Sequence, residues 1–229
     1  MSPFVAFPSA KSASDCDPVL CAWRDKGWKC AVFRDEGMER VGAEYVLWGA
    51  YEGYPKATNA LCRFLLEEEF DLQWICCAGD DMYPPDLPAC RIAHECTAHF
   101  GHGALGVMQC TGESGSERIC GSPLLSRGFI LRFNRGAGAF WPGYNHYFAD
   151  EELHDVTLTP SPPHPLSPSP VSPLLWQRPD LTIRHEHYSR TGQPQPLYMH
   201  KATARWGHDQ ALFLARKAGG FPGCEPLAA

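Results

Sequence analysis

The fold of this chain is decided by the stretch Trp74-Ile75-Cys76-Cys77-Ala78-Gly79-Asp80-Asp81-Met82-Tyr83-Pro84-Pro85. An apolar run of strand length is followed by a glycine, two adjacent carboxylates and a proline-marked loop. The sequence therefore places Asp80 and Asp81 at the carboxyl end of a buried strand, which is the edge where open α/β sheets hold their ligands. Two carboxylates at such an edge suit Mg²⁺ or Mn²⁺ bridging a diphosphate, because these ions bind carboxylate and phosphate oxygens together. A Gly-Asp-Asp turn is also ordinary loop chemistry, so a metal site and a plain turn both stay open at this point.

The composition is that of a globular protein. The chain has 229 residues, of which 44% are hydrophobic, and this is enough for one large domain or a core domain with an irregular extension. The formal net charge of -6 argues against a generic face for nucleic acid or another polyanion. The eleven cysteines are an odd number and lie largely inside apolar runs, which favours reduced core thiols. No secretory signal and no apolar stretch of membrane-spanning length is recognisable, so we expect a cytoplasmic protein without a transmembrane segment.

Strands and helices alternate in the part of the chain that precedes the two acids. The apolar runs of strand length are 4–7, 28–33 and 45–48. Asp17-Pro18 is expected to open a helix that ends at Gly27, and a second helix is expected over 55–69, where apolar residues recur at helical spacing. This alternation predicts an α/β fold with a mainly parallel central sheet flanked by helices and a Rossmann-like nucleotide-binding half.

Beyond the acids the pattern is less regular. A helix is expected over 86–100, a strand over 104–110 and a C-terminal helix over 204–214. The segment 134–143 is rich in glycine and carries Phe140-Trp141-Pro142, which suits either a flexible lid or a long surface loop.

Proline and serine dominate residues 158–173, and proline at nearly every second position forbids both helix and central strand. We therefore expect an exposed, disordered insertion there. The chain is accordingly divided into a domain over 1–157, the insertion over 158–173, and a C-terminal part of the same domain over 174–229.

Two further groups of polar side chains have patterns typical of functional sites. The acids Asp150-Glu151-Glu152 stand at the expected start of a helix, where they either favour the helix dipole or supply a general base. His185 and His187 flank one residue, so both point to the same side of an extended segment, as metal ligands often do.

Three spaced segments carry a likeness to known enzymes. Gly53-Tyr54-Pro55-Lys56-Ala57-Thr58-Asn59 matches a Gly-x-x-x-Ala-Arg-Asn helix start, with threonine in place of arginine. Ala78-Gly79-Asp80-Asp81 matches an Asp-x-Asp-Asp segment followed by proline, with alanine in place of the first aspartate. Farther on, Ala149-Asp150-Glu151-Glu152-Leu153 matches a Glu-Asp-x-Glu-Leu segment, with alanine in place of the first glutamate.

In this order and spacing, the segments resemble the nucleotide-sugar-dependent glycosyltransferases of the GT-A fold over residues 3–157, in particular the family 2-like members, including small ones from phage genomes. The resemblance implies a GT-A-like fold and a metal-dependent transfer of a sugar from a UDP- or GDP-sugar to an acceptor hydroxyl, with inversion. It leaves the acceptor open among a glycan, a lipid, a protein and a nucleic-acid base.

The resemblance also implies roles for single residues. Those implied in binding the nucleotide-sugar are Pro8, Ser9, Asp35, Lys56, Asn59 and Asp80. Those implied in holding Mn²⁺ or Mg²⁺ are Asp80, Asp81, His187 and His185. Asp150 matches the catalytic base, which takes the proton of the acceptor hydroxyl.

Two other interpretations stay open. Paired acids on this layout also serve metal-dependent nucleotidyl transfer, which would release pyrophosphate instead of a nucleoside diphosphate. The third interpretation is an inactive glycosyltransferase-like binding or scaffold protein that docks through its proline segment, since Ala78 replaces an acid and the insertion falls between the base and histidine segments.

Overall fold

The structure is a computed structural model that describes residues 2–158, 174–192, 194–195 and 197–225. Apart from Leu158, the predicted proline-rich insertion therefore lies outside the described residues. None of the helices in these ranges combines the length and the apolar character that crossing a membrane requires.

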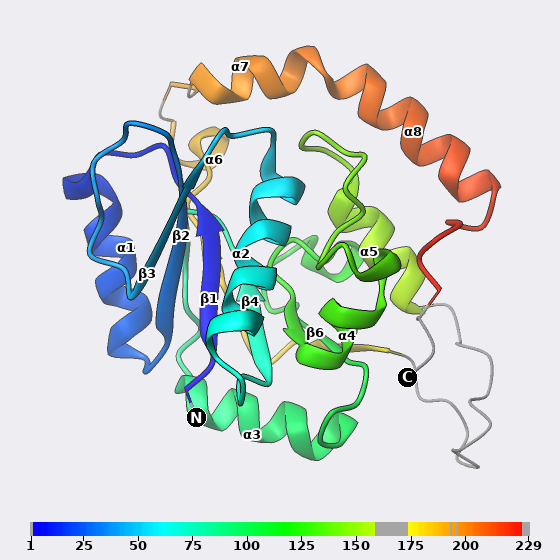
Figure 1. Ribbon diagram of the computed structural model, residues 1–229, viewed down its shortest axis with the longest axis horizontal. Coiled ribbons are helices and arrows are strands. Elements are labelled where there is room, and N and C mark those ends of the chain that lie inside the picture. Colours follow the sequence, from blue (N-terminus) through cyan, green and yellow to red (C-terminus); the bar gives the residue numbers. More distant parts are fainter. Residues whose placement is uncertain (1, 159–173, 193, 196, 226–229) are drawn as a thin grey trace.

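Seven strands of the described residues form one central sheet in the order β3-β2-β1-β4-β7-β6-β8 (Figure 1). In chain order these strands are β1 (Phe4–Pro8), β2 (Lys29–Asp35), β3 (Tyr45–Gly49), β4 (Trp74–Cys77), β6 (Val107–Cys110), β7 (Leu124–Ser126) and β8 (Leu175–Arg178). Strand β7 is antiparallel to both of its neighbours, β4 and β6, and the other neighbouring strands pair in parallel. The prediction of a mainly parallel α/β sheet is confirmed.

Helices cover both faces of this sheet. They are α1 (Ala13–Asp25), α2 (Tyr54–Glu68), α3 (Ala89–Phe100), α4 (Arg127–Arg132), α5 (Ala149–Leu158), α6 (Tyr188–Thr191), α7 (Leu197–Ala204) and α8 (Trp206–Ala218), with short 3-10 turns at Ser116–Arg118 and Asn134–Gly136. Side chains of α1 and α3 belong to the core on one face, and side chains of α2, α4 and α5 belong to the core on the other.

Strand β1 shows why the sequence reads as an uninterrupted apolar run. Phe4 and Ala6 lie in the core beneath α2, whereas Val5 and Phe7 lie in the core beneath α1. Successive side chains of a strand point to opposite faces, so a strand covered on both faces has to be apolar throughout.

The first helix begins earlier than predicted. It starts at Ala13, after Ser12, whose side chain accepts a hydrogen bond from the backbone N–H of Asp15 at 3.2 Å. Pro18 lies inside the helix and does not open it, so the prediction that Asp17-Pro18 marks the start is wrong. Serine is a strong N-cap, and here it outweighs the signal from proline. Other boundaries differ by a few residues. The C-terminal helix predicted over 204–214 corresponds to α8, and the prediction did not include α7, which precedes it.

The centre of the glycine-rich segment 134–143 is neither a lid nor a surface loop. Ala139 and Phe140 are buried, and the Asn59 side chain both donates to the Phe140 carbonyl at 2.7 Å and accepts from its backbone N–H at 2.9 Å. Gly138 packs so closely on Asn59 that an added Cβ would lie 2.8 Å from its carboxamide. Gly138 therefore allows this segment to pack tightly against α2.

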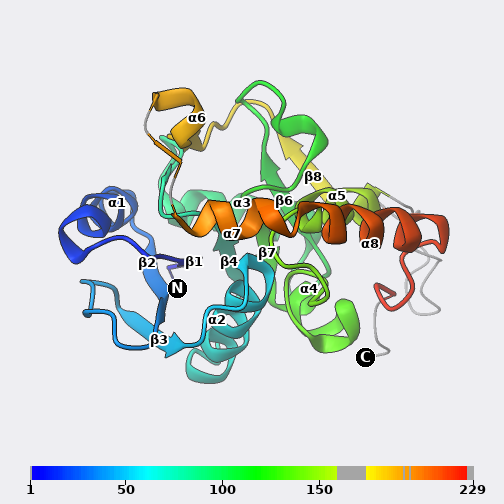
Figure 2. The same ribbon diagram turned by 90° about the horizontal axis from the view of Figure 1, so that it is seen from above.

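The topology places a crevice at one edge of the sheet. From β1 the chain moves outward through β2 and β3 and then returns to β4 on the other side of β1. Ligands of open α/β sheets bind at such a reversal, outside the carboxyl ends of the strands. Beside it, β5 (Met82–Tyr83) pairs antiparallel with β9 (Arg184–His185), and helices α7 and α8 cross above the edge of the sheet (Figures 1 and 2).

Candidate active site

A cavity of about 470 Å³ opens at the carboxyl ends of β1, β2 and β4. Residues that follow these strands, among them Ser9, Asp35 and Asp80, line its sheet side. The other lining residues come from the segments 51–54 and 145–151, from helices α7 and α8, which contribute Trp206 among others, and from Ile119, Gly121, His185 and His187. The volume is in the range of pockets that bind small molecules and cofactors.

Asp80 is held in a tight polar environment. It is 7% exposed, and Oδ2 accepts a hydrogen bond from Ser9 Oγ at 2.7 Å, while Lys11 Nζ lies 3.7 Å from Oδ1. Burial raises the pKa of Asp80, and the neighbouring Lys11 and Ser9 offset only part of this rise. The carboxyl group of Asp80 therefore has little access to solvent and already has protein partners.

The pKa of Asp81 is shifted in the opposite direction to that of Asp80. Its Oδ2 lies 3.2 Å from His185 Nε2, and the backbone N–H of Glu186 donates to the Asp81 carbonyl at 2.8 Å. Burial raises the pKa of Asp81, but the hydrogen bond and the charge of His185 outweigh it, and the pKa is lowered overall. Met82 pairs with His185 across β5 and β9, so this small sheet fixes the carboxylate and the imidazole beside each other.

The second histidine of the pair is less tightly tied to the acids. The ring of His187 lies 5.3 Å from that of His185, and its Nδ1 lies 2.7 Å from Ser189 Oγ. Burial lowers the pKa of His187, so its neutral form is favoured.

A second pair of carboxyl groups lines the cavity at the start of α5. Asp150 and Glu151 both contribute to the lining. The pKa of Glu151 is raised to about 8, mainly by burial and secondly by its hydrogen bond with Asp150. Near neutral pH Glu151 is therefore protonated and donates to Asp150, which is the arrangement of an acid and a base in contact.

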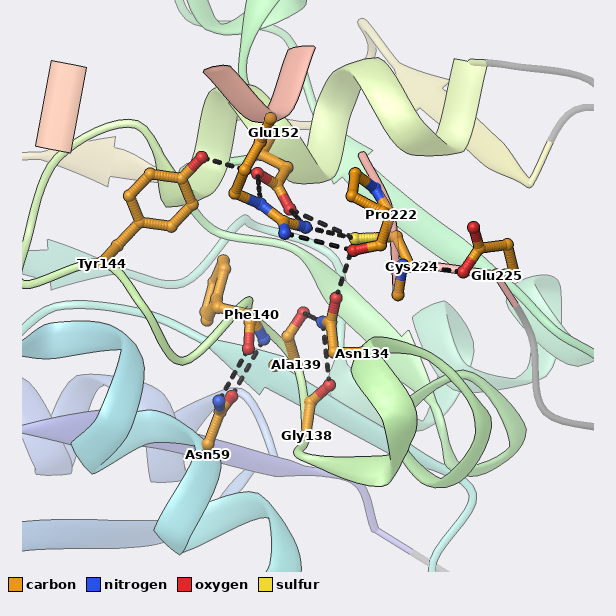
Figure 3. A network of polar contacts seen from close by, with 12 residues as sticks. Asn59, Asn134, Gly138, Ala139, Phe140, Tyr144, Glu152, Pro222, Cys224 and Glu225 are labelled. Atoms are coloured by element: carbon orange, nitrogen blue, oxygen red, sulfur yellow. Dashed lines mark hydrogen bonds and ion pairs between the residues drawn. The ribbon is translucent and has the colours of Figure 1, made fainter. Parts of the chain in front are cut away.

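The third acid of this helix has a different role. Glu152 is buried and forms two hydrogen bonds with Arg216 of α8, at 2.8 and 2.7 Å. Tyr144 Oη donates to it at 2.6 Å, and the Cys224 thiol donates at 3.1 Å (Figure 3). The thiol also lies 3.2 Å from Asn134 Oδ1, so the network joins α5, α8 and the glycine-rich segment. Glu152 thus docks α8 and does not reach the cavity.

A second buried acid, Asp209, fixes the loop that precedes α5. Asp209 is fully buried and accepts from the backbone N–H groups of Asn145, His146 and Tyr147 at 2.9 to 3.2 Å. It also accepts from Asn145 Nδ2 at 2.8 Å. Burial raises the pKa of Asp209, but these donors outweigh it and lower the pKa overall. Helix α8 therefore holds both the loop and the helix that carry one wall of the cavity.

Glycine is required where the α2 segment meets this loop. Gly53 has φ +117°, and an added Cβ would lie 1.9 Å from the Asn145 carbonyl oxygen. In the segment 53–59, which resembles a glycosyltransferase motif, Gly53 thus allows the start of α2 to pack closely against the loop at Asn145.

No protein-family model matches this chain, and no curated protein matches it.

The side chains that line the cavity limit how a metal ion could be coordinated. Among the described residues, no group of three or more His, Cys, Asp and Glu side chains is arranged to hold an ion. Asp81 and His185 do lie together, and Mg²⁺ in nucleotide sites takes one or two protein carboxylates and completes its shell with phosphate and water. These residues fit a metal that is completed by a phosphate-bearing ligand, and they do not form an all-protein cage.

The structure brings together most of the predicted site residues. Those that line the cavity are Pro8, Ser9, Asp35, Asp80, Asp81, Asp150, His185 and His187. Lys56 and Asn59 do not line it. Asn59 holds the Phe140 backbone, and Lys56 is exposed, with Nζ 3.5 Å from Glu52 Oε2. Both of these residues therefore contact neighbouring protein groups and not the cavity.

Several lining residues have no signal in the sequence. Tyr51 lies in the loop before α2, Tyr54 is the first residue of α2, and His146 lies in the loop before α5. Lys201 belongs to α7, Trp206 begins α8, and Arg205 lies between these two helices. Aromatic and basic residues of this kind are common on helix surfaces and in loops, so only their place in the fold marks them as site residues.

Proposed function

We propose that this protein is a metal-dependent glycosyltransferase that moves a sugar from a nucleoside-diphosphate donor to an acceptor hydroxyl, with inversion. The observation that carries the proposal is that one cavity holds two carboxylate pairs distant in sequence, Asp80 and Asp81 after β4 and Asp150 and Glu151 on α5. The reaction needs charge compensation at the diphosphate and a base at the acceptor, and two separate pairs suit these two tasks. The parallel sheet with its crevice at the strand reversal supports the GT-A-like assignment.

The nucleoside half of the donor fits the side of the cavity formed by β1 and β2. Pro8, Phe33 and Tyr51 supply apolar and aromatic surface there. Asp35 Oδ1 accepts from the Tyr51 backbone N–H at 2.8 Å, which leaves the other carboxylate oxygen for a ribose hydroxyl.

The diphosphate fits beside Asp81 and His185, which would hold the ion. Carboxyl groups far outnumber lysine and arginine in the described lining, so a diphosphate needs added positive charge to bind. A divalent cation held there supplies this charge and offsets the charge that develops on the leaving diphosphate. The Asp80 carboxylate already accepts a hydrogen bond from Ser9 and forms an ion pair with Lys11. We therefore assign Asp81 as the direct ligand of the metal ion, and we assign Asp80 the role of fixing the loop that follows β4.

Proton transfer falls to the α5 pair. In this proposal the acceptor oxygen attacks the anomeric carbon, its proton passes to the Asp150 carboxylate, and the nucleoside diphosphate leaves from the opposite face of the sugar. Protonated Glu151 donates to Asp150 and orients it. A base that contributes in this way is worth about 10²–10⁴-fold in rate.

A panel of sugar nucleotides incubated with the protein and Mn²⁺ tests the proposal through the release of nucleoside diphosphate. We expect release from at least one donor, reduced at least about 100-fold in Asp150→Asn. Asp86→Asn is the matched control, because Asp86 is a fully exposed acid outside the cavity. Pyrophosphate release from a nucleoside triphosphate would replace the proposal with nucleotidyl transfer, and nucleotide binding without any turnover would favour a scaffold.

A further inference from the structure

The wall of the cavity formed by α7 and the start of α8 differs in charge from the sheet side. Of the described residues that line the cavity, Lys201 and Arg205 are the only lysine and arginine. They lie four residues apart on nearly continuous helical backbone, because the Arg205 N–H donates to the Ala202 carbonyl and the Asp209 N–H donates to the Arg205 carbonyl. Side chains at this spacing share one face of a helix.

Neither cation is neutralised by a carboxylate among the described residues. Arg205 donates to Asn145 Oδ1 at 2.9 Å, which is a neutral partner. By contrast, Lys217 of the same helical segment pairs with Asp155 at 2.7 Å, and Arg216 pairs with Glu152. In a chain with a net charge of -6, two cations that line one cavity and have no carboxylate partner in the described part of the chain indicate a site for an anionic group.

Arg205 of this cationic pair contacts the loop that leads to the proposed base. Arg205 contacts Asn145, the first residue of the loop that Asp209 fixes and that leads into α5. Next to it, the ring of Trp206 lies 5.6 Å from that of Phe148, and both rings line the cavity. The wall thus combines two cations with aromatic surface, and its Arg205 contacts the loop that leads to Asp150.

We propose that Lys201 and Arg205 bind an anionic group of the acceptor, a phosphate monoester or a carboxylate, carried on a ring or other apolar body that contacts Trp206 and Phe148. This inference rests on the proposed function, since it assigns the wall beside Asp150 to the acceptor. It narrows the acceptor to a hydroxyl compound that is also an anion. The donor diphosphate is assigned to the other wall, with Asp81 and His185.

Binding of phenyl phosphate and benzoate to the full chain in metal-free buffer tests the proposal by ligand-observed NMR, with uncharged phenol as the reference ligand. We expect at least one anion to bind about tenfold or more tightly than phenol and to lose this advantage in Lys201→Gln/Arg205→Gln. Lys26→Gln/Arg91→Gln is the control, because both of these cations lie outside the cavity. Near-ultraviolet circular dichroism of each variant checks that the fold is kept.

The same variants titrated with UDP and Mn²⁺ separate this inference from the proposed function. Unchanged UDP affinity in the double variant supports assignment to the acceptor, whereas a parallel loss of UDP affinity overturns it, because the cations would then serve the donor. Equal binding of the anions by wild type and double variant, or no preference of the wild type for an anion, also overturns it. Anion binding that needs both cations, in a protein that binds no nucleoside diphosphate, would keep the anion site and remove the glycosyltransferase proposal.

Discussion

Removing the Arg216 guanidinium is expected to release α8 from the body of the protein. The side chains of Arg216 and Glu152 are 7% and 3% exposed, so this is a buried ion pair. Arg216→Met keeps most of the side-chain volume but leaves the Glu152 carboxylate with Tyr144 and Cys224 as its donors among the described side chains. Loss of one partner from a buried pair costs about 3–5 kcal/mol, because the remaining charge stays desolvated.

Urea unfolding followed by far-ultraviolet circular dichroism measures this change as a lower free energy of unfolding, and in a chain of this size the melting temperature should fall by about 6–20 °C. The double variant Glu152→Gln/Arg216→Met removes both charges and should recover part of the loss. Lys217→Met is the control, because its side chain is 54% exposed and its pair with Asp155 is worth at most about 1 kcal/mol. A loss below about 1 kcal/mol in Arg216→Met, or a double variant as unstable as the single one, would refute the reasoning.

Three further changes probe the same walls of the cavity. Asp209→Asn leaves backbone N–H groups of the 145–147 loop with a weaker acceptor, so we expect a loss of about 1–3 kcal/mol in urea unfolding; an unchanged free energy would show that the loop does not depend on this carboxylate. Because the pKa of Glu151 is raised from 4.5 to about 8, its contribution to stability is full below pH 4.5 and is lost as the pH rises through 8. Glu151→Gln should flatten the fall of the melting temperature over this range, and a slope equal to that of wild type would contradict the shift. Gly53→Ala puts a Cβ 1.9 Å from the Asn145 carbonyl, so we expect a lower melting temperature and weaker nucleotide binding, and a stability equal to wild type would mean that α2 does not pack there as described.

The sequence predicts the N-terminal half of the fold well because β1, β2 and β4 are buried on both faces and the edge strand β3 is also a short apolar run. Such strands read as short apolar runs, and the helices between them have clear apolar faces, so the order of β1 to β4 follows. The antiparallel strand β7 is only three residues long and lies among glycine and proline, so the alternation of strand-length and helix-length apolar patterns did not predict it. The start of α1 was misplaced because Pro18 is tolerated inside the helix.

The candidate site was predicted in part. Acids at the end of β4 mark the crevice directly, because the sheet topology brings strand ends together. In sequence Glu152 resembles a helix-capping acid or a general base, and nothing marks Asp209 and Arg216, yet each of the three is buried and holds a wall of the cavity. Glu152 and Arg216 are 64 residues apart, and Asp209 and His146 are 63 residues apart, so local spacing gives no sign of these pairs. Asn59 matches a residue implied in nucleotide-sugar binding by the resemblance to glycosyltransferases, but here its side chain forms hydrogen bonds with the Phe140 backbone.

We propose above that the cavity binds a nucleoside diphosphate through a metal held at Asp81 and His185. Isothermal titration of UDP and of GDP, each with and without Mn²⁺, tests it most directly. We expect Mn²⁺ to tighten the binding of at least one of them by about tenfold or more in the wild type, and Asp81→Asn to lose this gain. Equal affinity with and without Mn²⁺ for both nucleotides, or an Asp81→Asn variant that behaves as wild type, would contradict it.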